Sequence, residues 1–429
     1  MKIIFKNEPD WKGSIKYYVA SFSYNDTNIL NFDREGRVIS FISDNGTERK
    51  ITYKKGFDGT WLGIKRVSGR DPRVRFHLTE DQVHNLYLKI VLFAEKLINL
   101  LQQPESLEFF FDPQDVYNKD QIDNILSNWI KIIKKVSLKQ NKKDKANFPS
   151  IYSNVGILPP DRYGSLVIQV TTGCIYNKCS FCTLYEGISY SYKKPEELKQ
   201  HLQDILGFMG DSIGRFHSLF IGDANALTIP YTDLSEIFTI LNEAFFISDS
   251  KISYLKKNKP IFEGIYSFLD VFTGFKITAD QFNKLALKKL KMVYLGIETG
   301  SHKVLQILNK PNTTSKILKI INSLHEASIG VAVIFLIGAG GKMLEEEHVT
   351  ESIMLIKQMN LTSNDIIYLS KLFIYKGYQK IIEEKNIKSL SDKELENQFK
   401  IFKQELEKYY LTQNSKPIIT RYELLDFVY

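Results

Sequence analysis

The sequence predicts an α/β protein built on a partial (β/α)6, TIM-like barrel, with an N-terminal β-rich α+β domain before it and a C-terminal helical extension after it. Two observations support this fold class. Beyond Leu166, six short apolar runs alternate with stretches of helical period, and the first hundred residues alternate between strand-like pieces and turn signals. We therefore divide the chain into an N-terminal domain (1–136), a linker (137–164), the barrel (165–375) and the extension (376–429).

The N-terminal domain is predicted from strand-like segments such as "SIKYYVASFSY" and "RKITYKKG", with Asp58-Gly59 as a turn signal. A helix is expected to begin after Thr79 as N-cap and to end near Leu101, and a second helix around 121–136. Alternating aromatic residues indicate a sheet core, and we hypothesise that this domain recruits a substrate.

Residues 137–164 are predicted to be a linker. The segment contains several lysines and a Pro159-Pro160 pair, and it shows no apolar periodicity. Its basic cluster is more simply a solvated tether than a nucleic-acid contact.

The barrel is predicted from apolar runs that are continuous rather than alternating, as expected for parallel strands buried on both faces. These runs lie at 165–170, 218–221, 264–271, 292–297, 331–338 and 365–370. Helices are expected between them at 195–209, 232–246, 279–290, 314–327 and 345–359. The order predicts repeated βα units. In the extension, a Ser391…Glu394 capping box opens a further helix.

Composition and charge limit the classes of protein to which this chain can belong. Apolar residues make up 43% and charged residues 25%, the balance of a folded protein. A net charge of +8 is compatible with a nucleic-acid partner, but no nucleic-acid-binding motif supports one. The apolar stretch 85–101 contains Lys89, Glu95 and Lys96, so we expect no membrane association. With an odd number of cysteines we expect no disulfide framework and a reduced, cytoplasmic protein.

All three cysteines of the chain lie within nine residues, as Cys174-x4-Cys179-x2-Cys182. A structural zinc site needs four ligands, and the next histidine, His201, lies in a helical pattern. A plant-type 2Fe–2S cluster needs a fourth cysteine. Dithiol redox chemistry would leave Cys174 without a role, and three buried structural cysteines would not gather in a polar loop. A 4Fe–4S cluster held by three thiolates leaves one iron open, as catalytic metal sites do.

This segment resembles the cluster loop of the radical S-adenosylmethionine (radical SAM) superfamily. The usual form of that loop is C-x3-C-x2-C with an aromatic residue before the last cysteine, and Phe181 in "CSFC" matches the aromatic. The first spacing is one residue longer here. The resemblance implies that Cys174, Cys179 and Cys182 are the cluster ligands and that Phe181 contacts adenine.

Later strings continue the resemblance over about 166–370. "FIGDANAL" stands where the family has a Gly-Gly-Glu turn. The resemblance implies that Gly222 lets the backbone approach the methionyl amine of S-adenosylmethionine, and that Asp223 or Asn225 supplies an acceptor. A simple turn is the alternative interpretation.

The fourth and fifth apolar runs end in "LGIETGSHKVLQILNK" and "FLIGAGG". By the same resemblance, Glu298 suits a ribose hydroxyl or the methionyl ammonium, and Ser301 opens a helix whose positive end favours an anion. Gly338 belongs to the strand beside adenine. Alternatively, Glu298 only caps a helix.

The resemblance implies a 4Fe–4S cluster and S-adenosylmethionine as cofactors, and an electron donor such as flavodoxin or ferredoxin. Cleavage of S-adenosylmethionine to a 5′-deoxyadenosyl radical would start hydrogen abstraction from an unknown substrate. Without further cysteines in this chain we expect single-cluster chemistry: dehydrogenation, epimerisation, cyclisation or rearrangement. The alternative is a non-catalytic iron–sulfur or zinc binding protein on a barrel scaffold.

We expect any residue that donates hydrogen to the substrate radical to lie near the barrel mouth. Tyr176, Tyr185, Tyr266 and Tyr368 are candidates, with packing as the alternative role. His348 either lines the substrate side or is a satisfied helix histidine.

Overall fold

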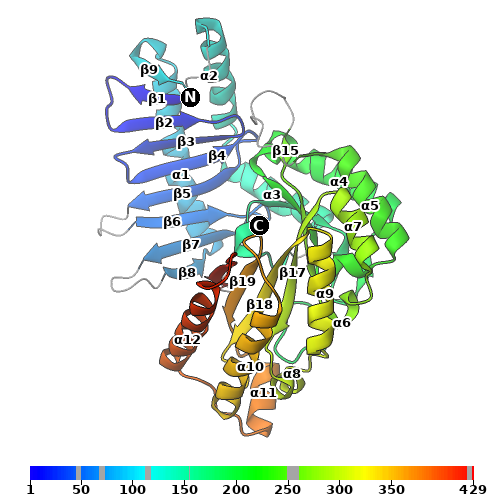
Figure 1. The fold of residues 1–429 in the computed structure, drawn as a ribbon. Helices are drawn as coiled ribbons and strands as arrows, with labels where there is room; N and C mark the ends of the chain where they lie inside the picture. Colours follow the sequence, from blue (N-terminus) through cyan, green and yellow to red (C-terminus); the bar gives the residue numbers. More distant parts are fainter. Residues whose placement is uncertain (45–49, 67–72, 112–116, 154, 249–259, 423–427) are drawn as a thin grey trace.

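The computed structural model describes residues 1–44, 50–66, 73–111, 117–153, 155–248, 260–422 and 428–429. An antiparallel sheet (blue in Figure 1) stands beside a curved parallel sheet covered by helices. No helix within these ranges has the length and apolarity needed to cross a membrane.

The N-terminal sheet has nine strands in the order β8-β7-β6-β5-β4-β3-β2-β1-β9, all pairs antiparallel. The strands are β1 (Lys2–Phe5), β2 (Trp11–Ile15), β3 (Val19–Tyr24), β4 (Asn28–Asp33), β5 (Val38–Asp44), β6 (Lys50–Lys55), β7 (Trp61–Arg66), β8 (Arg73–His77) and β9 (Leu107–Phe110). Helices α1 (Glu80–Leu101) and α2 (Lys119–Ile133) share one apolar core with this sheet. Thr79 caps α1 through a capping box with Gln82, as expected.

The second sheet has seven strands, all parallel, in the order β10-β13-β16-β17-β18-β19-β20. The strands are β10 (Ser165–Gln169), β13 (Ser218–Gly222), β16 (Ile265–Leu269), β17 (Leu290–Glu298), β18 (Gly330–Ile337), β19 (Ile366–Lys371) and β20 (Ile418–Arg421). Two further pairs are β11 (Thr171–Thr172) with β12 (Ser191–Tyr192) and β14 (Phe246–Ile247) with β15 (Ile261–Phe262). The first six strands of the barrel confirm the six predicted apolar runs.

Helices cover the outer face of the parallel sheet (Figure 1). The five predicted ones are α4 (Pro195–Met209), α5 (Tyr231–Ala244), α7 (Ala279–Leu287), α9 (Thr314–Glu326) and α10 (Glu345–Gln358). Two short helices, α6 (Val271–Gly274) and α8 (His302–Ile307), follow the carboxyl ends of β16 and β17. Their position places both of them at the rim where parallel barrels carry their chemistry.

The first strand of the barrel, β10, does not pair with the last one, β20, so the sheet stays open. Side chains occupy the free edge of β10 instead. The Val167 N–H donates to the Tyr429 hydroxyl at 2.7 Å, and the Tyr152 hydroxyl donates to the Val167 carbonyl at 3.0 Å. The Gln169 N–H donates to His201 Nε2 at 3.2 Å. These bonds satisfy edge groups that an unpaired strand would otherwise expose.

Residues 137–164 differ from the expected linker, because they contain helix α3 (Leu138–Ile151). Ser137 caps this helix, and its buried residues are two polar ones, Asn141 and Asp144, and Phe148. Asp144 accepts hydrogen bonds from Arg37 and Lys55 of the N-terminal sheet. A search for apolar periodicity misses such a helix, because polar residues make up most of its buried side and Phe148 is its one buried apolar residue.

The extension also departs from the expected all-helical structure. Helices α11 (Lys376–Glu384) and α12 (Asp392–Tyr410) are present, and α12 begins at the predicted Ser391–Glu394 capping box. The chain then returns to the parallel sheet as β20, which pairs with β19. This strand is four residues long and half-exposed, so its apolar signal is weak.

Candidate functional site

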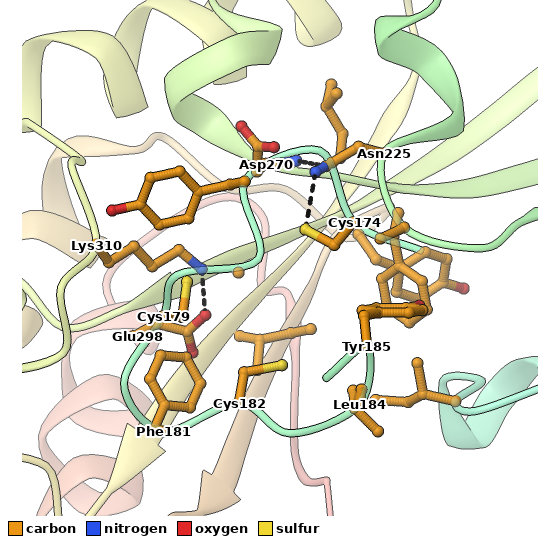
Figure 2. A pocket seen from close by; sticks show the side chains of 18 of the residues that line it. Cys174, Cys179, Phe181, Cys182, Leu184, Tyr185, Asn225, Asp270, Glu298 and Lys310 are labelled. Atoms are coloured by element: carbon orange, nitrogen blue, oxygen red, sulfur yellow. Dashed lines mark hydrogen bonds and ion pairs between the residues drawn. The ribbon is translucent and has the colours of Figure 1, made fainter. Parts of the chain in front are cut away.

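The three cysteines line one cavity of about 200 Å³ at the carboxyl ends of the barrel strands (Figure 2). The loop that carries Cys174, Cys179 and Cys182 follows β10 and β11. Residues from the ends of β13, β16, β17, β18 and β19 complete the wall. The structure therefore brings the three predicted ligands together at the expected rim.

Hydrogen bonds hold the cysteine loop against the segment that follows β17. Ser180 donates to the last carbonyls of α8: its N–H to Leu308 O at 3.0 Å and its hydroxyl to Ile307 O at 2.9 Å. The Tyr176 hydroxyl donates to the Asn309 carbonyl at 2.7 Å. Carbonyls at a helix end lack intrahelical partners, so the loop satisfies them and gains a fixed position.

The thiols are partly buried and need a positive partner to ionise. Burial raises the pKa of Cys179 to about 12 and raises the pKa of Cys182. The Lys310 ammonium opposes this rise at Cys179. Among the described residues, no three His, Cys, Asp or Glu side chains converge as a single metal ion would require. Thiolates are the donors that iron–sulfur clusters take, and the three thiols line one common cavity.

A buried ion pair forms a second wall of the cavity. Lys310 Nζ lies 2.5 Å from Glu298 Oε1, and both side chains are more than nine-tenths buried. Despite its burial, the pKa of Lys310 is raised, chiefly by the Glu298 carboxylate and then by Cys179. Glu298 ends β17 at a register shift with a backbone φ of +71°, an uncommon conformation for a residue with a side chain. The pair is therefore built into the site at a backbone cost.

The ends of β13 and β16 meet through Asn225 and Asp270. The Asp270 N–H donates to Asn225 Oδ1 at 2.6 Å. One carboxylate oxygen, Asp270 Oδ1, accepts from the Thr273 N–H and hydroxyl at 2.8 and 2.6 Å. The other oxygen, Oδ2, is buried without a hydrogen-bond partner among the described residues. Burial raises the pKa of this carboxyl, and the hydrogen bonds from Thr273 lower it.

Apolar and aromatic side chains form most of the remaining wall. They include Phe181, Phe268, Phe272 and Tyr294, and the ring of Phe272 packs edge-on against Tyr176 at 4.7 Å. Phe181 also contacts the apolar cluster beneath α8 and α11. Such walls exclude water and strengthen electrostatic interactions inside the cavity.

Among the predicted cofactor residues, Phe181, Asn225 and Glu298 line the cavity, whereas Gly222, Asp223, Ser301 and Gly338 do not. Both carboxylate oxygens of Asp223 accept from Gln169 Nε2 at 3.1 Å.

Ser301 caps α8 and donates to Glu347 at 2.7 Å. The Gly338 N–H donates to Gln398 Oε1 at 2.7 Å. In the structure these side chains and amides support the rim.

The tyrosine candidates divide in the same way. Tyr176 and Tyr185 line the cavity, while Tyr266 and Tyr368 do not. The Tyr368 hydroxyl donates to Asp161 at 2.7 Å. His348 is fully buried, with Nδ1 2.8 Å from the Thr299 hydroxyl, and it does not line the cavity.

Sequence reasoning missed two charged residues of the cavity, Asp270 and Lys310. Asp270 had a usable signal, because it is the one acidic residue of the third predicted run (264–271) and directly follows β16. Lys310 had none, because its pairing with Glu298 depends on how the segment after α8 folds back.

Three comparisons with known proteins complete the description. The family model described as the Radical SAM superfamily matches residues 168–353. No curated protein matches the chain.

Solved structures resemble it at low identity. Coproporphyrinogen III oxidase (HemN) from Escherichia coli, a radical SAM enzyme, is 13% identical, with 58% of this chain and 54% of that chain covered and a TM-score of 0.40. SuiB from Streptococcus suis, bound to S-adenosylmethionine, is 14% identical over 86% and 71%, also with a TM-score of 0.40. The radical S-adenosylmethionine methyltransferase TsrM from Kitasatospora setae is 15% identical over 54% and 43%, with a TM-score of 0.38. The chain thus spans about half the length of HemN and less of TsrM.

Proposed function

Residues 168–353 form a domain of the radical SAM superfamily, whose cofactors are a 4Fe–4S cluster and S-adenosylmethionine, and on that premise we propose that Cys174, Cys179 and Cys182 hold the cluster. The observation that carries this proposal is that all three thiols of the chain line one cavity at the strand ends. When bound, the cluster supplies the electron that cleaves S-adenosylmethionine to a 5′-deoxyadenosyl radical, which abstracts hydrogen from a substrate.

Asp270 is proposed to accept a hydrogen bond from S-adenosylmethionine, in place of the acceptor expected from the β13 turn. Asp223 is occupied by Gln169, and Asn225 Oδ1 is occupied by the Asp270 N–H. Asp270 Oδ2 remains without a partner in the described residues, and Asp270 lines the cavity. A ligand ammonium or hydroxyl group would relieve the cost of this buried oxygen.

The other cavity residues have supporting roles in the proposal. Lys310 places a fixed positive charge beside Cys179, and Glu298 holds that ammonium in place. Phe181 is proposed to pack against adenine, and the aromatic wall keeps water away from the reacting atoms. Tyr176 and Tyr185 stay the tyrosine candidates for hydrogen donation from the cavity wall.

The proposal also covers the substrate class, the electron donor and the cellular location. The substrate is one that undergoes single-cluster chemistry, and an electron donor such as flavodoxin or ferredoxin reduces the cluster. The cytoplasm, where thiols stay reduced, is the proposed location. The alternative function is a non-catalytic iron–sulfur or zinc binding protein.

The test is anaerobic reconstitution, reduction with dithionite and addition of S-adenosylmethionine, with 5′-deoxyadenosine measured by chromatography. We expect about four irons and four sulfides per chain, and loss of both cluster and cleavage in Cys179→Ala. Asp26→Asn, at an exposed turn of the N-terminal sheet, is the control. A loaded cluster without any cleavage would favour the binding protein, and zinc in place of iron would refute the proposal.

A further inference from the structure

The side-chain amide of Asn225 has one orientation that its neighbours accept. The Asp270 backbone N–H, which can only donate, lies 2.6 Å from one amide atom of Asn225, so that atom is the oxygen. The amide nitrogen, Nδ2, therefore faces the other way, and it lies 3.9 Å from Cys174 Sγ (Figure 2).

The backbone fixes this amide in place. Asn225 has a left-handed conformation, with φ 56° and ψ 33°, and is 5% exposed. Asparagine adopts this conformation more readily than most residues. The Thr228 N–H and hydroxyl also donate to the Asn225 carbonyl, at 2.9 and 2.8 Å. The side chain thus projects toward the sulfur from a constrained turn.

Cys174 is the cysteine with the most N–H donors. Besides Asn225 Nδ2, the backbone N–H of Asn177 lies 3.5 Å from Cys174 Sγ. Cys182 has the Leu184 backbone amide, and Cys179 has the charge of Lys310. A glutamate in the usual Gly-Gly-Glu turn would offer only carboxylate oxygens, whereas the amide in this chain offers donors.

We propose that Asn225 is a positioning residue that donates a hydrogen bond to Cys174 and thereby raises the reduction potential of the cluster; this rests on the proposed function, since it requires that Cys174 ligates iron. Reduction adds negative charge, part of which the cysteine sulfurs carry. A hydrogen bond to a sulfur stabilises the more negative, reduced state. Groups that orient and polarise ligands tune a metal centre in this way.

The experiment compares Asn225→Gly, Asn225→Asp and Asn360→Gly with the unmodified chain. Glycine and aspartate both tolerate the left-handed backbone, so neither variant strains the turn. Asn225→Asp keeps an acceptor for the Asp270 N–H but removes the donor. Asn360 is the matched control, because it is also left-handed, with φ 51°, yet is exposed and does not line the cavity. The readouts are iron content, the midpoint potential from a titration followed by electron paramagnetic resonance, and the resonance Raman Fe–S(Cys) bands.

We expect the midpoint potential to decrease from the unmodified chain to Asn225→Gly, and further to Asn225→Asp, which adds negative charge beside the sulfur. Asn360→Gly should match the unmodified chain. Full iron loading with unchanged potentials in both Asn225 variants would overturn the inference while leaving the proposed function intact. Loss of the cluster in both would also overturn it, because Asn225 would then hold the cluster rather than tune it. No cluster in the unmodified chain would instead refute the proposed function.

Discussion

Replacing Asp144 by alanine removes the carboxylate that two buried cations share. Asp144 Oδ1 accepts from Arg37 Nε at 3.0 Å, and Oδ2 accepts from Lys55 Nζ at 2.9 Å. The side chain of Asp144 is 1% exposed, and those of Arg37 and Lys55 are 7% and 2% exposed. Burial lowers the pKa of Lys55, and Asp144 opposes that effect, so the carboxylate favours the charged form of this lysine.

The expected cost follows from what the variant leaves behind. Removing one partner of a buried pair costs about 3–5 kcal/mol, because the remaining charge stays buried without compensation. Asp144→Ala leaves two such cations, although Arg37 Nη2 keeps a bond of 2.5 Å to the Phe208 carbonyl. We therefore expect the free energy of unfolding to fall by about 4 kcal/mol. Adding Lys55→Met should restore part of the loss, because it removes one uncompensated charge.

The assay is urea unfolding of the cluster-free protein, followed by circular dichroism and tryptophan fluorescence. Asp26→Asn serves as the control, because the Lys12–Asp26 pair is exposed on both sides and should contribute less than about 1 kcal/mol. An Asp144→Ala midpoint equal to that of Asp26→Asn would refute the reasoning. So would a double variant less stable than the single one.

Two further predictions concern a buried histidine and the free carboxylate. Burial lowers the pKa of His348 to about 4, below the usual 6.5, so the folded state binds fewer protons than the unfolded state. The contribution of the neutral histidine to the free energy of unfolding is complete above pH 6.5, and about 3 kcal/mol of it is lost as the pH falls toward 4. The urea midpoint of His348→Gln should therefore change less with pH over this range than that of the unmodified chain. An equal pH dependence in both proteins would contradict this. Asp270→Asn should weaken S-adenosylmethionine binding by about tenfold to a hundredfold at unchanged iron content. Calorimetry on reconstituted protein measures this, with the exposed Asp280→Asn as control, and equal affinities in all three proteins would count against an acceptor role for Asp270.

The periodicity of apolar residues located the barrel, because apolar side chains recur along its strands and helices at the spacing typical of each. The run predicted at 292–297 is the centre of β17 (Leu290–Glu298), and the helix predicted at 195–209 has those bounds in α4. Elements held by polar contacts gave no such signal. Helix α3 is held by the ion pairs of Asp144 and by the packing of Phe148 against Phe208, and β20 is held by its pairing with β19. Both depend on partners distant in sequence, which a local pattern does not contain.

The same distinction applies within the site. The three cysteines lie close together in the sequence, so their spacing alone predicted that they act together. Asp223 and Asn225 lie two residues apart after β13, and only tertiary contacts separate their roles: Gln169 occupies the carboxylate, whereas Asp270 orients the amide. Residue type at a strand end therefore predicts a candidate, and the partner of each oxygen decides whether it is available.

The two strings that carried the family resemblance, the cysteine loop and the segment after β17, form one structural unit. Ser180 bonds the carbonyls at the end of α8, and Asn309 bonds the loop from the other side through Tyr176 O–H and the Lys178 carbonyl. Glu298 opens this segment, and Lys310 closes it beside Cys179. We expect such a unit to tolerate a longer first spacing between cysteines, because α8 fixes the loop at Ser180, one residue from Cys179. The extra residue is then absorbed between Cys174 and Cys179, where Asn177 takes a left-handed turn with φ 43°.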